Sequence, residues 1–293
     1  MRRKNREVKF ATFYGNNYGL KLNLLQKRKE ETVSRTNKLT TSWIVGGGSG
    51  SGTAVESLVG LEGENICGSE LPSFPHQISA AMGGFMQGRI YICGGNSGGF
   101  ENSLIHKDCY ASLASNPSKG WVPTPSLPFN TSHAAHAVLN DKLYIFGGYQ
   151  KPSCGYRPEV QIFESRSQKW FQSRNIDPPE HIGAYGCAAA VGKYIFVMGG
   201  WFPNFVYTSS CKENLSNEEL SAVNKEFNFY HDRVQVFDTA RGTWFAGPRL
   251  LMRRRNHGCT YVDVAGRHVS SYHGVDLKFR TVSFLGYHGC RRI

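Results

Sequence analysis

Apolar runs that end in two adjacent glycines occur four times in this chain of 293 residues. The runs are WIVGG, IYICGG, LYIFGG and YIFVMGG, and their first glycines are Gly46, Gly94, Gly147 and Gly199. A glycine pair costs backbone entropy and packs nothing, so its regular return at a strand end indicates a structural need. The pairs recur at a nearly constant interval of about 50 residues, and such a period predicts an array of repeated units.

Each unit has further parts in a fixed order. A short alternating run follows each glycine pair, at 54–58, 108–113, 159–164 and 233–238. An anchor residue comes next, and then a proline-containing turn, a histidine and a strand of small residues. The anchors are Cys67, Trp121, Trp170 and Trp244. The interval from an anchor to the next glycine pair is nearly the same in each unit, so Cys67 is expected to occupy the tryptophan position.

Four short strands per unit describe a four-stranded antiparallel blade. The combination of glycine pair, tryptophan and proline turn resembles the kelch-type β-propeller from about Thr41 to Val264. The resemblance implies an all-β fold of about four to five blades. Family members usually close with six or seven blades, so we expect an incomplete or open ring. Three units are whole, and the fourth is split between the chain ends, which are expected to share a blade.

The glycines and tryptophans are interpreted as scaffold. The apolar runs are expected to be the inner strands of the blades, packed between neighbouring blades. The glycines are expected to allow a sharp turn and close backbone contact, and the tryptophans to fill the space between blades. The residues of this predicted structural motif are Gly46, Gly47, Gly94, Gly95, Gly147, Gly148, Gly199, Gly200, Trp121, Trp170 and Trp244.

The predicted propeller, residues 41–264, is flanked by a basic and disordered segment at 1–40 and a degenerate tail at 265–293. The net charge is +12. Residues 1–40 hold 11 Lys and Arg against 3 acidic residues, and residues 241–293 hold 10 against 2. The body between them is therefore mildly acidic, and no nucleic-acid partner is expected. No apolar stretch reaches the roughly 18 residues that a membrane helix needs, so no membrane span is expected.

Eight cysteines and two glycosylation sequons leave the compartment open. No CxxC pair occurs, which argues against a zinc ribbon or a thioredoxin-type site. Cys93, Cys187 and Cys259 fall in strands and are interpreted as small buried residues. Cys154 and Cys211 are a candidate disulfide, and Asn130 and Asn214 are candidate glycosylation sites. Without a recognisable signal peptide the chain is expected to be cytoplasmic; with one at a different N-terminus it would be extracellular.

The interval from Gly199 to Trp244 is clearly longer than its counterparts, and a long loop on a rigid scaffold often binds a partner. A basic cluster, RLLMRRRNH, lies downstream at 249–257. Family members often place an arginine before the histidine of this strand, so Arg255 is assigned to the scaffold. The candidate partner-binding residues are Trp201, Phe202, Phe205, Tyr207, Arg253 and Arg254.

No catalytic or metal site is predicted, and neither a cofactor nor a small-molecule substrate is expected. His76, His133, His181 and His257 are interpreted as one structural histidine per blade. No nucleophile elbow, phosphate loop or paired carboxylate stands out. Copper radical oxidases also use a kelch-like propeller, but no stretch matches their site.

The resemblance implies a non-catalytic module whose loops bind a protein partner. Such a module could recognise the substrate of a ubiquitin ligase or bind the cytoskeleton. The segment before the first repeat, which begins at Trp43, is too short for a BTB domain, so a complete ligase adaptor is not expected in this chain. The alternatives are a secreted, disulfide-containing binding protein and, less well supported, a copper oxidase.

Overall fold

The computed structural model describes residues 72–97, 104–150, 160–171, 182–201 and 230–259 with their side chains. Further strands are described by their backbone alone, at 11–12, 20–25, 40–45, 55–61, 64–71, 151, 155–156, 172–173, 260–264 and 267–273. The statements that follow concern these residues. The fold is all-β, and the single helical element among the described residues is the 3₁₀ turn η1 (Pro117–Lys119).

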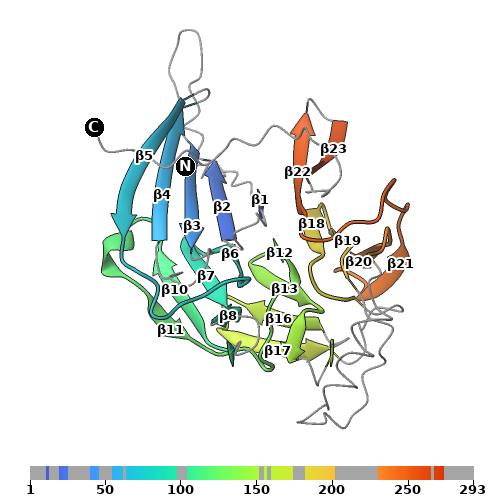
Figure 1. Cartoon of the computed structure of the whole chain (residues 1–293), viewed down its shortest axis with the longest axis horizontal. Coiled ribbons are helices and arrows are strands. Elements are labelled where there is room, and N and C mark those ends of the chain that lie inside the picture. The colour runs from blue at the N-terminus through green and yellow to red at the C-terminus, as the bar shows by residue number, and fades with distance from the viewer. Residues whose placement is uncertain are drawn as a thin grey trace, which may run out of the picture.

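Four four-stranded antiparallel sheets and one three-stranded sheet follow one another around a common centre (Figure 1). The first sheet is β2 (Leu20–Leu25), β3 (Thr40–Val45), β4 (Val55–Leu61) and β5 (Glu64–Leu71). The second is β6 (Met82–Met86), β7 (Arg89–Cys93), β10 (Cys109–Leu113) and β11 (Val122–Thr124). The third is β12 (Ala135–Leu139), β13 (Lys142–Phe146), β16 (Val160–Glu164) and β17 (Lys169–Ser173).

The fourth sheet is β18 (Cys187–Val191), β19 (Tyr194–Met198), β20 (Val234–Asp238) and β21 (Thr243–Ala246). The fifth contains β1 (Ala11–Thr12), β22 (Gly258–Val264) and β23 (Arg267–His273). Two short hairpins extend the loops after the glycine pairs: β8 (Asn96–Ser97) with β9 (Leu104–Ile105), and β14 (Tyr149–Lys151) with β15 (Gly155–Tyr156). These sheets confirm the predicted four-stranded antiparallel blades and their predicted number.

The innermost strand of each blade is the small-residue strand, because β6 packs against β12, β12 against β18, and β18 against β22. Each glycine-pair strand is second from the centre, paired on both sides. Its apolar character follows from this place: β13, for example, has four consecutive buried residues, Leu143 to Phe146. The interpretation of the glycine-pair run as the inner strand is therefore wrong by one position.

The two chain ends share the fifth sheet, as expected, because β1 pairs with β22. The split unit is nevertheless not assembled as predicted, because the first glycine-pair strand, β3, pairs with β2 and β4 and not with β22. No hydrogen-bonded ladder joins the first and fifth sheets among the described strands. Strands β1 and β2 also lie inside the segment 1–40, for which disorder was expected, and most of β23 lies in the predicted tail.

The tryptophans fill the space between adjacent blades. Trp121 of the second sheet packs edge-on against Phe74, with ring centroids 5.1 Å apart, and its indole donates to the Pro72 carbonyl at 3.1 Å. Trp170 of the third sheet donates in the same way to the Pro125 carbonyl at 2.7 Å. The backbone carbonyls of the proline turns thus accept hydrogen bonds from the tryptophan anchors. In the first sheet, Cys67 lies opposite Leu58, the register at which Trp170 lies opposite Phe163.

Three of the four hydrophobic cores of the described residues span two neighbouring sheets. The core between the second and third sheets contains Met82, Tyr91 and Leu143 with Phe163 and partly buried Trp170. The next core packs Phe146 and Val160 against residues of the fourth sheet such as Val197 and Phe237. Each blade therefore depends on its neighbour for burial, as expected for a repeat fold.

Among the described residues, no helix reaches the length and hydropathy that crossing a bilayer requires.

We predict that Gly147→Ala destabilises the protein far more than Gly192→Ala. Both glycines have left-handed φ values, +63° and +59°, so both substitutions carry a backbone cost of about 1–2 kcal/mol. A Cβ at Gly147 would also clash with the carbonyl oxygens of Ile182 and Gly183, whereas nothing lies within 4 Å at Gly192. Urea unfolding should show an additional loss of about 2 kcal/mol or more for Gly147→Ala. Equal losses would contradict this account.

Candidate functional site

The connections that follow the glycine pairs meet the connections that precede the inner strands at one end of the blades. We call this end the glycine-pair face; its described connections are 72–81, 94–97 with 104–108, 125–134, 147–150, 182–186, 199–201 with 230–233, and 247–257. The glycines have left-handed φ values between +57° and +117° in the second, third and fourth sheets. At the first glycine of each of these pairs the backbone that leads into the next blade comes so close that a Cβ would not fit, and at the second glycine the same holds for the backbone that leads into the inner strand of its own blade.

A chain of backbone hydrogen bonds links the blades on this face. The His133 amide donates to the Ala80 carbonyl at 3.0 Å, the Tyr185 amide to the His133 carbonyl at 2.8 Å, and the Asn256 amide to the Tyr185 carbonyl at 2.8 Å. All four residues have positive φ values, from 50° to 63°. They are therefore equivalent positions in four successive blades, and they fix the repeat register on the face.

This register corrects the interpretation of the histidines. His133 is itself a positive-φ residue, His76 lies four residues before the equivalent Ala80, and His257 lies one residue after Asn256. They occupy three different structural positions, not one; His181 lies outside the described residues. His133 stacks near Tyr185, and buried His257 packs against Gly199. The alignment from sequence failed because the turns before the inner strands differ in length.

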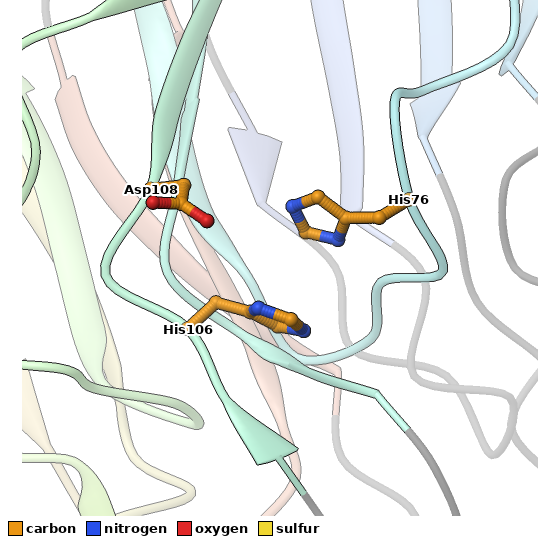
Figure 2. Close-up of side chains that lie close together, drawn as sticks. All are labelled: His76, His106 and Asp108. Atoms are coloured by element: carbon orange, nitrogen blue, oxygen red, sulfur yellow. The ribbon is translucent and has the colours of Figure 1, made fainter.

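His76 approaches two residues that the sequence analysis did not single out, His106 and Asp108 (Figure 2). One potential ligand atom from each residue lies within 4.8 Å of the other two. The imidazole centroids of His76 and His106 are 4.3 Å apart. All three side chains are half-buried. His76 comes from the connection between β5 and β6, and the other two from the segment between β9 and β10.

The glycine pair of the second sheet holds the segment that carries His106 and Asp108. The Gly94 amide donates to the Asp108 carbonyl at 3.0 Å, and the His106 amide donates to the Gly95 carbonyl at 2.9 Å. Burial and the neighbouring His76 lower the pKa of His106, while the Asp108 carboxylate opposes the shift. The neutral imidazole, which is the form that binds metals, is therefore favoured at His106.

A second cluster lies where the fourth sheet meets the fifth. The Arg255 guanidinium lies 4.5 Å from the ring centroid of Tyr230 and 6.0 Å from that of Trp201. The second distance is at the limit of a cation–π contact. Trp201, a predicted binding residue, is held by backbone bridges to Ala184 and Tyr230. Arg255 packs against this aromatic group, in keeping with its assignment to the scaffold.

The segment 251–253 beside this cluster is exposed, and the residues on either side of it are anchored. The Leu250 amide donates to the Asp232 carbonyl at 2.7 Å, and the Arg254 amide donates to the His231 carbonyl at 3.3 Å. Between these anchors, Leu251 is 102% and Met252 51% exposed, and Arg253 is exposed as well. Arg254, the other predicted basic residue, is half-buried. An apolar and basic tip on a fixed base is the kind of surface that binds a protein.

The remaining predicted residues divide into two groups. Asn130 is half-buried in the connection between β11 and β12. Phe202, Phe205, Tyr207, Cys154, Cys211, Asn214, Gly46 and Gly47 lie outside the described residues, as does the centre of the long loop.

Cys93, Cys187 and Cys259 are buried as predicted, but the disulfides in which they take part were not predicted. Cys93 is bonded to Cys109 across β7 and β10, and Cys187 to Cys259 between the inner strands β18 and β22. All four are buried, and no described cysteine is free. The pairs arise because the register places Cys93 directly opposite Cys109 and sets β18 beside β22. Sequence spacing alone does not reveal either juxtaposition.

Comparison with known proteins agrees with the repeats. The chain is 27% identical over 176 residues to a Kelch domain-containing protein of Vibrio cholerae, covering 57% of this chain and 44% of that protein. It is 26% identical over 170 residues to human Kelch domain-containing protein 1, covering 48% of this chain and 40% of that protein. Beta-scruin of Limulus polyphemus is 24% identical over 194 residues, covering 63% of this chain and 19% of that protein. No protein-family model matches the chain.

The solved structure of YjhT superposes with a TM-score of 0.52 at 14% identity, covering 75% of this chain and 68% of that one, which supports the fold. These matches confirm the resemblance to kelch-repeat proteins that the repeats indicate. It spans less than half the length of each of these curated relatives.

We predict that the protein loses stability in acid because His136 and His257 are buried and His133 is largely shielded from solvent. Burial lowers the pKa of each to about 4, whereas an unfolded histidine titrates near 6.5. The unfolded state therefore binds more protons between these values, and the free energy of unfolding falls as the pH drops from about 6.5 to 4. Each histidine lowers the free energy of unfolding by on the order of 3 kcal/mol over this range. The loss levels off once the pH is below the pKa of the folded state.

The variant His136→Gln tests one of these contributions. Its urea midpoint should fall less steeply with pH than that of the unsubstituted protein between pH 6.5 and 4. Parallel pH profiles would contradict the assignment.

Proposed function

We propose that the protein is a non-catalytic module that binds a protein partner on its glycine-pair face. The observation that carries the proposal is the exposed tip Leu251–Arg253, which presents two apolar side chains and a cation from an anchored loop. Apolar side chains that lie together on a surface mark interaction sites more often than scattered ones do. The names of the kelch relatives give general support for a propeller with a binding role.

The tip favours a partner with an acidic rim around an apolar patch. Asp232 does not neutralise the whole cluster, because it pairs with Arg249 at 2.8 Å. Arg253, exposed beside the apolar pair, is then available to a carboxylate of the partner, and such rim charges mainly speed association. A role in substrate recognition for a ubiquitin ligase or in cytoskeletal binding is compatible with this surface and belongs to the same proposal.

A specific observation also favours the secreted form of this proposal. Two buried disulfides, Cys93–Cys109 and Cys187–Cys259, involve all four cysteines whose side chains are described. Disulfides persist in oxidising compartments. We propose that the binding module works in such a compartment, in place of the cytoplasm expected from the N-terminus.

For the binding face, we expect the triple variant Leu251→Ser, Met252→Ser, Arg253→Glu to lose partner capture at least tenfold. The measurement is quantitative mass spectrometry of proteins retained from a lysate of the source cells by the immobilised full chain. Phe171→Ser is the matched control, because Phe171 is 46% exposed on the outer strand β17, away from this face. A partner retained equally by all three proteins would contradict the assignment, and circular dichroism checks that each is folded.

For the compartment, we expect protein from the source cells to show no reactive thiol at the four paired cysteines. The Cys187–Cys259 bond closes a span of 72 residues and the Cys93–Cys109 bond one of 16. Chain entropy then assigns roughly 4 and 3 kcal/mol to them, so Cys187→Ala, Cys259→Ala should lower the urea midpoint more than Cys93→Ala, Cys109→Ala. Alkylation of these cysteines without denaturant or reductant, read by peptide mass, would overturn the proposal.

A further inference from the structure

We propose that His76, His106 and Asp108 form a binding site for a divalent transition-metal ion of the zinc type. The site is independent of the exposed tip Leu251–Arg253, which lies on another blade. Two imidazoles and one carboxylate form a donor set used in proteins by zinc and by other first-row metals with open coordination positions. Figure 2 shows the three side chains directed into one common space from two segments of the chain.

The hydrogen bonds of His76 leave one ring nitrogen as a bare acceptor. Its Nδ1 lies 2.9 Å from the backbone carbonyl of Gln77. A carbonyl can only accept, so Nδ1 carries the proton and Nε2 of the neutral ring presents a lone pair. That Nε2 is shielded from solvent and has no hydrogen-bond partner among the residues that the structure describes. A bound cation would satisfy it, and a metal-binding histidine commonly donates its other ring N–H to a backbone carbonyl.

The position of His106 is fixed from two sides. Its Nε2 lies 2.8 Å from the Ser97 hydroxyl on β8, which orients the ring. Its backbone is held by Gly95 and, through its carbonyl, by the Thr131 amide at 3.2 Å. The backbone of Asp108, two residues further along the chain, is held by the Gly94 amide, which donates to its carbonyl. Both donors therefore come from a short segment attached to the rigid core of the second sheet, and a preorganised site of this kind is what metal binding requires.

The distances suit a site that closes around its ion. Ligand atoms around zinc are about 3.3 Å apart for bonds of about 2.0–2.1 Å, and the present donors lie within 4.8 Å. The three side chains stand on connections and not within strands, so small shifts can bring their donor atoms to the separations found around zinc. Three protein ligands leave a fourth position for water or for a ligand atom from another molecule.

The fourth sheet supplies an internal comparison. His231 occupies the place of His106, because its amide donates to the Gly200 carbonyl at 3.2 Å. Arg233 occupies the place of Asp108, because the Gly199 amide donates to its carbonyl at 2.9 Å. The same backbone frame thus carries a cation where the second sheet carries a carboxylate. The metal site is therefore a property of particular side chains of the second sheet and not of the repeat.

The test is a titration of the full chain, with any free thiols blocked by alkylation, first with Co²⁺ and then with Zn²⁺. We expect one equivalent of Co²⁺ to give visible absorption bands, Zn²⁺ to displace it, and the thermal midpoint to rise with Zn²⁺. His106→Gln and Asp108→Asn should each weaken binding at least tenfold. His231→Gln is the matched control and should bind as the unsubstituted chain does.

The absence of a one-to-one Co²⁺ or Zn²⁺ complex in the unsubstituted chain would overturn the proposal, whether or not the variants fold. Equal affinity in His106→Gln, Asp108→Asn and the unsubstituted chain would also overturn it. If His231→Gln lost binding as strongly as His106→Gln and Asp108→Asn, the metal would not be specific to this site, and the proposal would be overturned.

Discussion

Close approach of backbone to backbone between neighbouring blades is the constraint on which the rest of the structure depends. The paired glycines permit it, because a Cβ at Gly147 would meet the carbonyls of Ile182 and Gly183 in the next blade. With the backbones this close, amides and carbonyls of successive blades bond through Ala80, His133, Tyr185 and Asn256. The apolar strands beside them then bury their side chains between sheets, and tryptophans fill the remaining space.

The same backbone frame positions chemically different side chains in different blades. In the second sheet it presents His106 and Asp108 to His76, and in the fourth it presents His231 and Arg233 beside the exposed segment 251–253. The scaffold repeats because burial and backbone bonding need the same geometry in each blade. The side chains on its loops are free of that requirement, so function has to be argued from each loop separately.

Features that recur along the chain could be predicted from the sequence. Features that depend on contacts between segments distant in sequence could not. The predicted blades followed from four glycine pairs in phase, and the place of Cys67 followed from the constant interval to the next pair. The histidines were misaligned, because one residue of difference in a turn moves a side chain to another structural position. The partners of Cys93 and His76 were missed, because each lies on a segment that only sheet register or loop closure brings near.

The sequence by itself determined the repeat unit, the class of fold and the residues that must be small or aromatic. These properties depend on local backbone conformation and on period, both of which are written along the chain. The tertiary structure alone decided which cysteines pair, which strand is innermost and which polar residues meet on the glycine-pair face. These depend on hydrogen bonding and packing between segments distant in sequence, such as Cys187 with Cys259 and His76 with His106, for which the chain carries no local signal.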